Sequence, residues 1–427
     1  MIQMQSDTAT AGTLDPTFGV DGVVEVREQG AVLYSVLPLN GKLIYADQYF
    51  SAGRMSMRLR RMNSQGIFES SFGDNGSTVL PIDWSTAPRF GLFPYLNGNF
   101  LVKGTYIDST GQRDMVFALL NQDGQLDTAF GDKGFVRIDP YELSITGVSA
   151  TFSKDPNDKI KARNFSTAEN YIGGSVCVQP DGKILVSHSG VSGQDGNGYW
   201  WRGLLIRLMP DGTFDKSFNN TGSLFVKLGG LDNETISIAL QSDGKILVFG
   251  SYYPNDSDDF NAFVIRYMAN GEEDSGFNGG KPAVINHGDL NNILAGTISI
   301  RESDGAILVV GSASKTYEPY LPYTPWIAVL NPNGSPNLLF NNGRPLFSSI
   351  LEGGGLWQNC AWQEDKILVA RSVAARYLST GLLVTSFNGK GWFDYKSSYH
   401  HMALTEDKKM VLIGYAAGYP FVLRSLI

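Results

Sequence analysis

The fold is decided by the segment Gln179-Pro-Asp-Gly-Lys-Ile-Leu-Val186, which is followed by Gly203-Leu-Leu-Ile-Arg-Leu208 and Pro210-Asp-Gly-Thr-Phe-Asp-Lys-Ser-Phe218. An Asp-Gly pair between two apolar runs is typical of a β-hairpin, because a type I′ turn needs positive φ at both central positions. A third apolar strand then contains Arg207, and a fourth, Ser223-Leu-Phe-Val-Lys227, follows the turn after Phe218. One unit therefore predicts four antiparallel strands.

The same pattern recurs seven times. It is centred on Phe18, Phe72, Phe130, Phe218, Phe277, Phe340 and Phe387, with spacings of 54, 58, 88, 59, 63 and 47 residues. A period near 60 fits all seven copies if residues 140–171 are an insertion between the second and third units. Seven units of four strands predict an all-β chain that folds as one seven-bladed β-propeller.

The two ends of the chain complement one another. Residues 421–427 supply a third strand with no fourth strand after it, and residues 12–26 supply a turn and a fourth strand with no hairpin before them. We therefore expect residues 22–27 to pair with residues 421–426 and to close the blade formed by residues 399–427. Ring closure would remove exposed sheet edges from a single domain spanning residues 1–427. We expect residues 1–11 to form a flexible N-terminal segment.

The unit resembles the bacterial delta-60 repeat, whose pattern is similar to Gln-Pro-Asp-Gly-Lys-Ile-Leu-Val, then Arg-Tyr, then Asp-Gly-Thr-Leu-Asp-x-x-Phe-Gly. Residues 179–186, Arg207 and residues 210–218 carry the resemblance most fully. It departs from the pattern at Glu364-Asp365-Lys366, which lacks the glycine, and at Pro336-Asn337, which replaces Leu-Asp. The resemblance implies a propeller scaffold in a bacterial protein and implies little about activity.

Composition excludes several classes of protein. Hydrophobic residues make up 42% of the chain and the net charge is −8, which together argue against disorder. The acidic balance disfavours nucleic acid as a partner, and no apolar run is long enough to insert in a membrane. No secretory signal is visible at the N-terminus, so we expect a cytoplasmic location or export by a signal-independent route. We also expect a monomer.

The repeated side chains are best explained as structural, since a catalytic role is rarely needed seven times. We expect the seven Phe rings to be buried between neighbouring blades. An Arg recurs five residues before the turn Gly, and a carboxylate follows that Gly, so each pair should form a charge-assisted hydrogen bond across the turn. The Arg residues are Arg61, Arg207, Arg266 and Arg376, and the carboxylates are Glu69, Asp215 and Asp274. The two cysteines, Cys177 and Cys360, should be free buried thiols.

Variation between units concentrates in the connections after the second and fourth strands, which must share one face of the propeller. We expect loops at residues 187–201, 251–260 and 313–325, and these loops are rich in aromatic residues. The candidate ligand- or partner-binding residues are Tyr199, Trp200, Trp201, Tyr252, Tyr253, Tyr317, Tyr320 and Tyr323. Such rings stack on sugars or anchor a protein partner. The alternative is that they only pack the loops onto the blades.

The loop Pro254-Asn-Asp-Ser-Asp-Asp259 offers a candidate Ca²⁺ site. Asp256, Asp258 and Asp259 carry the oxygen ligands that Ca²⁺ prefers, but the spacing lacks the EF-hand pattern and its distal Glu. A solvated acidic loop explains the same residues. The sequence predicts no other cofactor.

No catalytic motif is present: the chain lacks His-Glu-x-x-His, Gly-x-Ser-x-Gly and a Walker A sequence. We therefore expect a non-catalytic scaffold that recognises a protein through the long-loop face of the propeller. Two alternatives stay open. One is a carbohydrate-binding propeller that uses the aromatic loops, and the other is a hydrolase or lyase with a carboxylate or metal site at the mouth of the channel.

Overall fold

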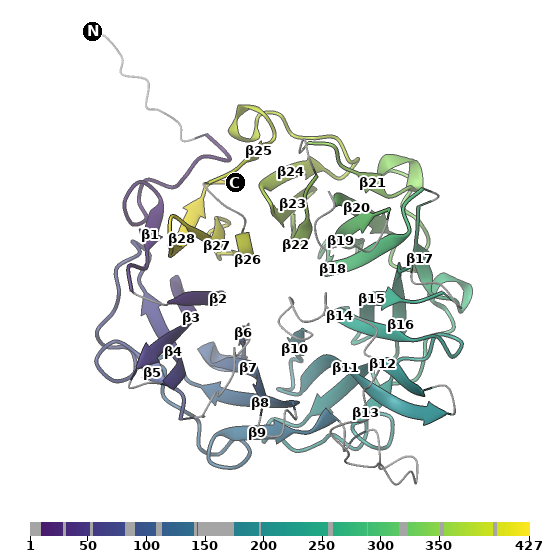
Figure 1. The fold of residues 1–427 in the computed structure, drawn as a ribbon, viewed down its shortest axis with the longest axis horizontal. Coiled ribbons are helices and arrows are strands. Elements are labelled where there is room, and N and C mark those ends of the chain that lie inside the picture. Colours follow the sequence, from purple (N-terminus) through teal and green to yellow (C-terminus); the bar gives the residue numbers. More distant parts are fainter. Residues whose placement is uncertain are drawn as a thin grey trace.

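The computed structural model describes residues 10–28, 31–51, 54–81, 90–107, 113–140, 143, 175–195, 198–254, 259–287, 289–315, 323–350, 354–395 and 399–427. Their strands form seven four-stranded antiparallel sheets. Figure 1 shows these sheets arranged as blades around a central axis, with the first strand of each blade innermost. The predicted all-β propeller with seven blades is confirmed.

The first four blades follow the chain in order. Blade 1 consists of β2 (Val32–Leu39), β3 (Lys42–Ser51), β4 (Arg54–Met62) and β5 (Thr78–Val79). Blade 2 consists of β6 (Phe90–Pro94), β7 (Phe100–Ile107), β8 (Arg113–Leu120) and β9 (Phe135–Ile138). Blade 3 consists of β10 (Val176–Val178), β11 (Ile184–Asp195), β12 (Gly198–Leu208) and β13 (Ser223–Phe225). Blade 4 consists of β14 (Asn233–Leu240), β15 (Ile246–Tyr252), β16 (Asn261–Tyr267) and β17 (Ala283–Ile285).

The remaining blades repeat this order except at the point of closure. Blade 5 consists of β18 (Asn292–Ile300), β19 (Ile307–Ser314), β20 (Thr324–Leu330) and β21 (Leu346–Phe347). Blade 6 consists of β22 (Trp357–Gln363), β23 (Lys366–Arg371), β24 (Ala374–Leu378) and β25 (Trp392–Phe393). Blade 7 consists of β26 (Tyr399–Leu404), β27 (Met410–Ala416), β28 (Tyr419–Ser425) and β1 (Val23–Glu25). Among the described residues there are four short 3₁₀ turns, namely η1 (Leu96–Gly98), η3 (Phe277–Gly279), η4 (Asn341–Gly343) and η5 (Phe387–Gly389).

The ring closes as the sequence predicts. Strand β1 pairs with β28 in antiparallel register, with Val23 opposite Leu423 and Glu25 opposite Phe421. The N–H of Gly12 also donates to the carbonyl of Leu426 at 2.8 Å. The outer edge of blade 7 is therefore covered by the N-terminal segment. Residues 1–9 and most of the insertion at residues 140–171 lie outside the described residues.

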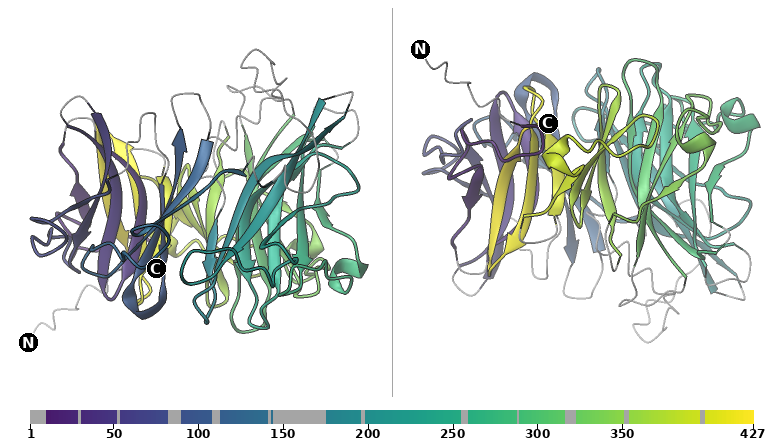
Figure 2. Two further views of the ribbon diagram at one scale, coloured as in Figure 1. Left: turned by 90° about the horizontal axis from the view of Figure 1, so that it is seen from below. Right: turned by 90° about the horizontal axis from the view of Figure 1, so that it is seen from above.

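Seen from the side, the strands of each blade run between two opposite faces (Figure 2). We call the face that carries the turns after first and third strands the short-turn face, and the opposite face the long-loop face. The expectation of a loop at residues 187–201 is wrong, because β11 and β12 continue through it and pair as far as Asp195 and Gly198. Tyr199, Trp200 and Trp201 belong to β12, and aromatic residues are enriched in strands. No helix in the described part of the chain is long and apolar enough to cross a membrane.

The core lies in the seams between blades. One apolar cluster, for example, joins Leu247 and Phe249 of blade 4 to Ile307 and Trp326 of blade 5. The seven repeated Phe rings are all buried to 98% or more, as predicted. Each ring reaches the turn Gly of the next blade: a Cβ on Gly124 would stand 2.6 Å from Phe72, and φ at Gly124 is +80°. Glycine is therefore required there by both space and conformation.

A ring of backbone hydrogen bonds links the seven blades on the short-turn face. In every blade the residue after the repeated Phe donates its N–H to the carbonyl just before the next blade's turn Gly, at 2.7–3.1 Å. The pairs are Gly19–Gln65, Gly73–Asp123, Gly131–Asp211, Asn219–Asn270, Asn278–Asn333, Asn341–Thr380 and Asn388–Ala11. The last pair again uses the N-terminal segment to complete the ring.

The innermost strands are joined by a second set of bonds. Their ladders are shifted by a bulge in several blades, for example between Thr235 and Ser237. A backbone N–H at or near the bulge then donates to a side chain of the preceding blade. The donor–acceptor pairs are Val36–His401, Leu92–Ser35, Ile238–Ser175, Ile298–Ser237 and Cys360–Thr297. His401 is thus a structural acceptor at the seam that closes the ring.

Candidate functional site

The predicted Arg–carboxylate pairs are confirmed on the short-turn face. Arg207 binds Asp215 at 2.8 Å, Arg266 binds Asp274 at 2.8 Å, and Arg61 binds Glu69. Each guanidinium also stacks on the repeated Phe of its own blade, with 4.8 Å between Arg207 and the Phe218 ring centre. A further hydrogen bond from each Arg reaches a carbonyl of the next blade. These repeated charges therefore hold blades together.

The sequence analysis missed a fourth such pair. Arg424, at the C-terminal end, binds Asp15, near the N-terminal end, at 2.8 Å, and both side chains are buried. The signal was present, because Asp15 stands three residues after a turn Gly as Asp215 does. It was overlooked because the two partners are separated by almost the whole chain.

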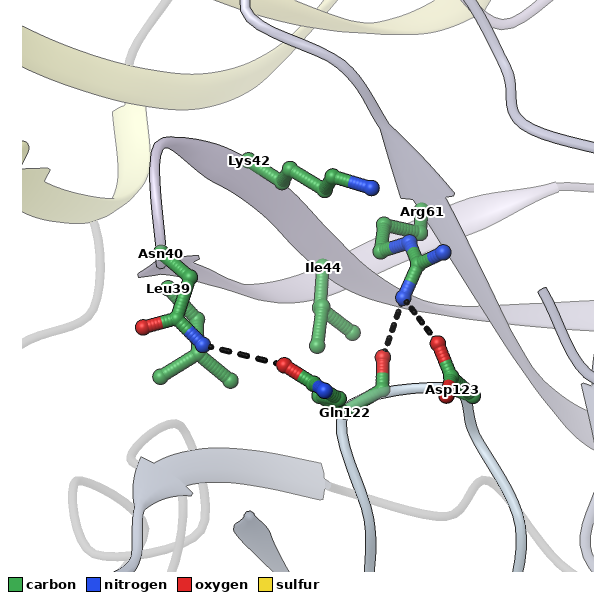
Figure 3. A pocket seen from close by; sticks show the side chains of 7 residues that line it. All are labelled: Leu39, Asn40, Lys42, Ile44, Arg61, Gln122 and Asp123. Atoms are coloured by element: carbon green, nitrogen blue, oxygen red, sulfur yellow. Dashed lines mark hydrogen bonds and ion pairs between the residues drawn. The ribbon is translucent and has the colours of Figure 1, made fainter. Parts of the chain in front are cut away.

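A small pocket of about 140 Å³ opens on the short-turn face between blades 1 and 2 (Figure 3). The two basic side chains that line it, Lys42 and Arg61, both form ion pairs with carboxylates. Lys42 pairs with Glu69 at 2.8 Å, and Arg61 pairs with Glu69 and with Asp123. The pocket thus belongs to the blade-linking structure and presents no unpaired cation to a ligand.

Ionisable groups interrupt the repeat within the first or second strands of blades 2 to 4. Lys103 is the fourth residue of the second strand in blade 2, a position that is Ala46, Phe249, Val310, Ala370 and Ile413 in five other blades. Lys103 is 2% exposed, and its Nζ donates to the carbonyl of Ser187 in blade 3 at 3.0 Å. Burial lowers its pKa to about 7, because the charged ammonium is poorly solvated in the seam.

His188 and Glu234 interrupt the repeat on the next two blades. His188 stands where four other blades have glycine, at Gly104, Gly250, Gly311 and Gly414. Glu234 is opposite Ser251, as Leu294 is opposite Ser312 in blade 5, so a carboxyl replaces an apolar side chain. Glu234 is 2% exposed and its Oε2 makes no hydrogen bond to the described residues. Burial raises its pKa to about 8, so the acid is neutral at pH 7.

The candidate aromatic residues that the structure describes lie in or beside long-loop connections of blades 3 to 5. Tyr253 is buried and stacks on Phe260 with 4.1 Å between ring centres. With Leu294 and Tyr323 these two rings form one apolar cluster that joins blade 4 to blade 5. Part of the aromatic content therefore packs the loops onto the blades, as the structural alternative expects.

Two other candidates are more accessible. Tyr252 is half-buried, with its ring edge-on to Phe263 at 6.2 Å. Trp201 is also half-buried, and its backbone N–H donates to Asp232 of the next connection at 3.0 Å. The backbones of Tyr199 and Trp200 belong to β12, but their side chains, like the whole of Tyr317 and Tyr320, lie outside the described part of the structure.

The proposed metal ligands are only partly placed. Asp259 is half-buried next to Phe260, whereas Asp256 and Asp258 lie outside the described residues. Among the residues that are described, no three His, Cys, Asp or Glu side chains are grouped so as to hold a metal ion. Cys177 and Cys360 are free thiols, and burial raises the pKa of both to about 12, so neither is an activated nucleophile.

Comparison with known proteins supports a propeller repeat. A family described as a domain of unknown function, DUF5122, beta-propeller, matches residues 179–218 and 241–277, which lie in blades 3 and 4. No curated protein matches the sequence.

Several solved structures align with most of this chain at 9–10% sequence identity. An ulvan lyase bound to its oligosaccharide aligns with a TM-score of 0.46 and 9% identity over 98% of this chain and 94% of the lyase. An acylaminoacyl peptidase of Pyrococcus horikoshii gives 0.44 and 9% over 90% of this chain, which spans about half (49%) of that peptidase. A protein of unknown function from Dyadobacter fermentans gives 0.41 and 10% over 85% and 97% of the two chains. Likenesses at this level carry no information on substrate or activity.

Proposed function

We propose that this protein is a non-catalytic binding scaffold of the delta-60 repeat class, and that it recognises a partner protein through the long-loop face of blades 3 to 5. The short-turn face uses its repeated Phe, Gly and Arg residues to hold the ring together. The opposite face is where blades differ from one another, and loops on a rigid scaffold are the usual place for binding residues.

One observation carries the proposal. Lys103 takes a buried position that is apolar in five other blades, Glu234 takes a buried position that is Leu294 in blade 5, and the half-buried His188 takes a position that is glycine in four other blades. Burying an ionisable group is unfavourable for folding unless it is paired or hydrogen-bonded. The same end of the propeller carries the cluster of Tyr253, Phe260, Leu294 and Tyr323, which fixes the connections of blades 4 and 5 against each other. Connections that this buried cluster holds rigid lose less conformational entropy when they bind a partner.

The experiment compares two faces of the same protein. The wild-type chain, a Trp201→Ala/Tyr252→Ala variant of the long-loop face and a Leu339→Ser variant of the short-turn face are immobilised at equal density. Leu339 is a matched control because its side chain is 81% exposed on the face that we assign to structure. Each surface is exposed to protein extracts of the source cells and to a glycan array, and retained species are identified by mass spectrometry.

The proposal expects one or more proteins that bind wild type and the Leu339→Ser variant and lose at least tenfold in affinity for the double variant. Circular dichroism must show the same fold for all three chains. Retention of glycans alone, lost in the double variant, would instead establish the carbohydrate-binding alternative. Partners that bind all three chains equally would refute the assignment of the long-loop face.

A further inference from the structure

The Arg–carboxylate unit of the short-turn face has the same geometry in blades 3 and 7. In blade 3, Asp215 accepts hydrogen bonds from Arg207 Nε at 2.8 Å, from the N–H of Ser217 at 3.0 Å and from its hydroxyl at 2.6 Å. In blade 7, Asp15 accepts the equivalent bonds from Arg424 and Thr17 at 2.8, 3.0 and 2.7 Å. Three hydrogen bonds therefore converge on each carboxylate, and a lysine of the same blade also lies close, with Lys183 3.4 Å from Asp215 and Lys409 2.9 Å from Asp15.

The other end of each guanidinium is satisfied by the next blade. The terminal nitrogen of Arg266 donates to the carbonyl of Pro332 at 2.6 Å, and that of Arg424 donates to the carbonyl of Ser64 at 2.7 Å. Both carbonyls stand two residues before a turn Gly. In the four blades that hold the complete unit, the buried cation thus has a carboxylate at Nε and a carbonyl at its far end.

Blade 6 contains the Arg without these partners. Arg376 occupies the same position, stacks on Phe387 at 4.8 Å and is 7% exposed. The N–H of Val384 donates to the carbonyl of Arg376 at 2.9 Å, as Asp215 does to Arg207, so the backbones match and valine takes the place of the carboxylate. The guanidinium makes no hydrogen bond or ion pair with any described residue, and its Nε is fully buried. Burial accordingly lowers the pKa of Arg376.

The far end of Arg376 also lacks its usual acceptor. The turn of the next blade supplies that acceptor elsewhere, and for blade 6 this turn is assembled from Thr10–Gly12 and Leu426. The carbonyl of Thr10, two residues before the turn Gly, accepts from the hydroxyl of Thr13 at 2.6 Å instead of from Arg376. Ser386 is exposed and corresponds to Ser217, whose hydroxyl accepts from Arg207 at 3.2 Å.

We propose that Arg376 and Ser386 form a binding site for a carboxylate or phosphate group on the short-turn face, at the seam between blades 6 and 7. Valine blocks the Nε side, so the anion binds the two terminal nitrogens of Arg376 in a bidentate manner and takes a third hydrogen bond from the hydroxyl of Ser386. The ligand supplies the negative charge that Asp or Glu supplies in four other blades. This site is separate from the long-loop face, so its test does not depend on the binding function proposed there.

The test measures the thermal unfolding of the full chain in increasing sodium phosphate or sodium acetate, with sodium chloride keeping the ionic strength constant. A ligand that binds only the folded state lowers the unfolding equilibrium constant by a factor of 1 + [L]/Kd, which is about elevenfold at ten times Kd. We expect a saturable rise of the midpoint in wild type and in an Arg344→Gln control, which removes an exposed arginine of blade 5.

The rise should be absent in Arg376→Gln and strongly reduced in Val384→Asp, where the new carboxylate supplies the charge internally. A response to both anions indicates a carboxylate ligand, such as an acidic side chain of a partner, and a response to phosphate alone indicates a phosphorylated one. No saturable response in wild type, or an equal response in Arg376→Gln, would overturn the proposal. Because Val384→Asp keeps Arg376 in place, the result does not depend on whether Arg376→Gln folds.

Discussion

Restoring the missing carboxylate of blade 6 is expected to stabilise the protein. In Val384→Asp, the new side chain gains the partners that Asp215 has in blade 3, namely an Arg Nε, a backbone N–H and a hydroxyl. Hydrogen bonds to a charged group contribute about 1.5–3 kcal/mol each. The new carboxylate also removes the free-energy cost of burying the Arg376 guanidinium without a partner. Desolvation of the carboxylate and loss of the half-buried valine, about 1 kcal/mol, offset most of this gain. We expect a net stabilisation of about 1–2 kcal/mol.

The assay is urea unfolding at pH 7, read by circular dichroism and Trp fluorescence. The matched control is Thr385→Asp, which adds the same charge one residue away on an exposed side chain. The reverse change, Asp215→Val, leaves Arg207 buried without its acid and should cost about 3–5 kcal/mol. Asp215→Val removes the carboxylate beside Arg207 in blade 3, and Val384→Asp adds one beside Arg376 in blade 6. Together the two variants measure the Arg–carboxylate interaction in two blades.

The stability gained by Val384→Asp should depend on pH, because it requires an ionised carboxylate. Burial raises the pKa of Asp215, but the hydrogen bonds from Ser217 and the charge of Arg207 outweigh it and lower the pKa to about 2. A carboxyl whose pKa is lower in the folded state stabilises above its unfolded value near 4 and loses that contribution as pH falls towards the folded value. The advantage of Val384→Asp should therefore be full at pH 7 and disappear between about pH 4 and 2. A variant no more stable than Thr385→Asp at pH 7 would refute the reasoning.

Three further predictions concern the seams and the closure. Glu234 has a pKa of about 8 in the folded state against 4.5 in the unfolded state, so its contribution to folding stability is present below pH 4.5 and is lost as pH rises through 8. In urea unfolding, Glu234→Gln should be more stable than wild type by about 1–3 kcal/mol at pH 9 and similarly stable at pH 5. Unfolding free energies of the two proteins that change in parallel with pH would contradict this. Phe218→Ala should lose about 3–5 kcal/mol because the ring is fully buried, whereas Leu339→Ala, on an exposed side chain, should change stability by less than about 0.5 kcal/mol in the same assay. Deletion of residues 1–28 removes β1 and the partner of Arg424, so the thermal midpoint should fall and proteolysis should begin within blade 7; a deletion variant as stable as the intact chain would show that closure by β1 is dispensable.

Much of the fold could be predicted from the spacing of a few residue types. A turn glycine, an Asp-Gly pair and the repeated Phe recur with a period that only a ring of similar blades explains. The pairing of β1 with β28 followed from the incomplete units at the two ends. The Arg–carboxylate bonds followed from their constant separation of eight residues in Arg61–Glu69, Arg207–Asp215 and Arg266–Asp274.

The candidate site was harder to predict because burial in a propeller depends on the neighbouring blade. The run Phe100-Leu-Val-Lys103 is apolar on both faces, so periodicity does not reveal whether Lys103 faces solvent or a seam. Residues 187–201 were expected to form a loop but belong to a β-hairpin, because β11 and β12 pair with each other along this segment. The aromatic candidates divided in a similar way: Tyr253 is buried between two connections, whereas Tyr252, one residue earlier, is half-buried.

The number of blades, the strand order and the closure of the ring can be predicted from the sequence alone, because they depend on local turn chemistry repeated at a fixed period. Which charges are compensated depends partly on contacts between blades. The sequence already shows that Val384 stands eight residues after Arg376, where Asp215 stands after Arg207. The acceptor from the next blade is the carbonyl of Ala269 for Arg207, whereas Arg376 has none among the described residues, and such contacts between distant chain segments leave no local signal.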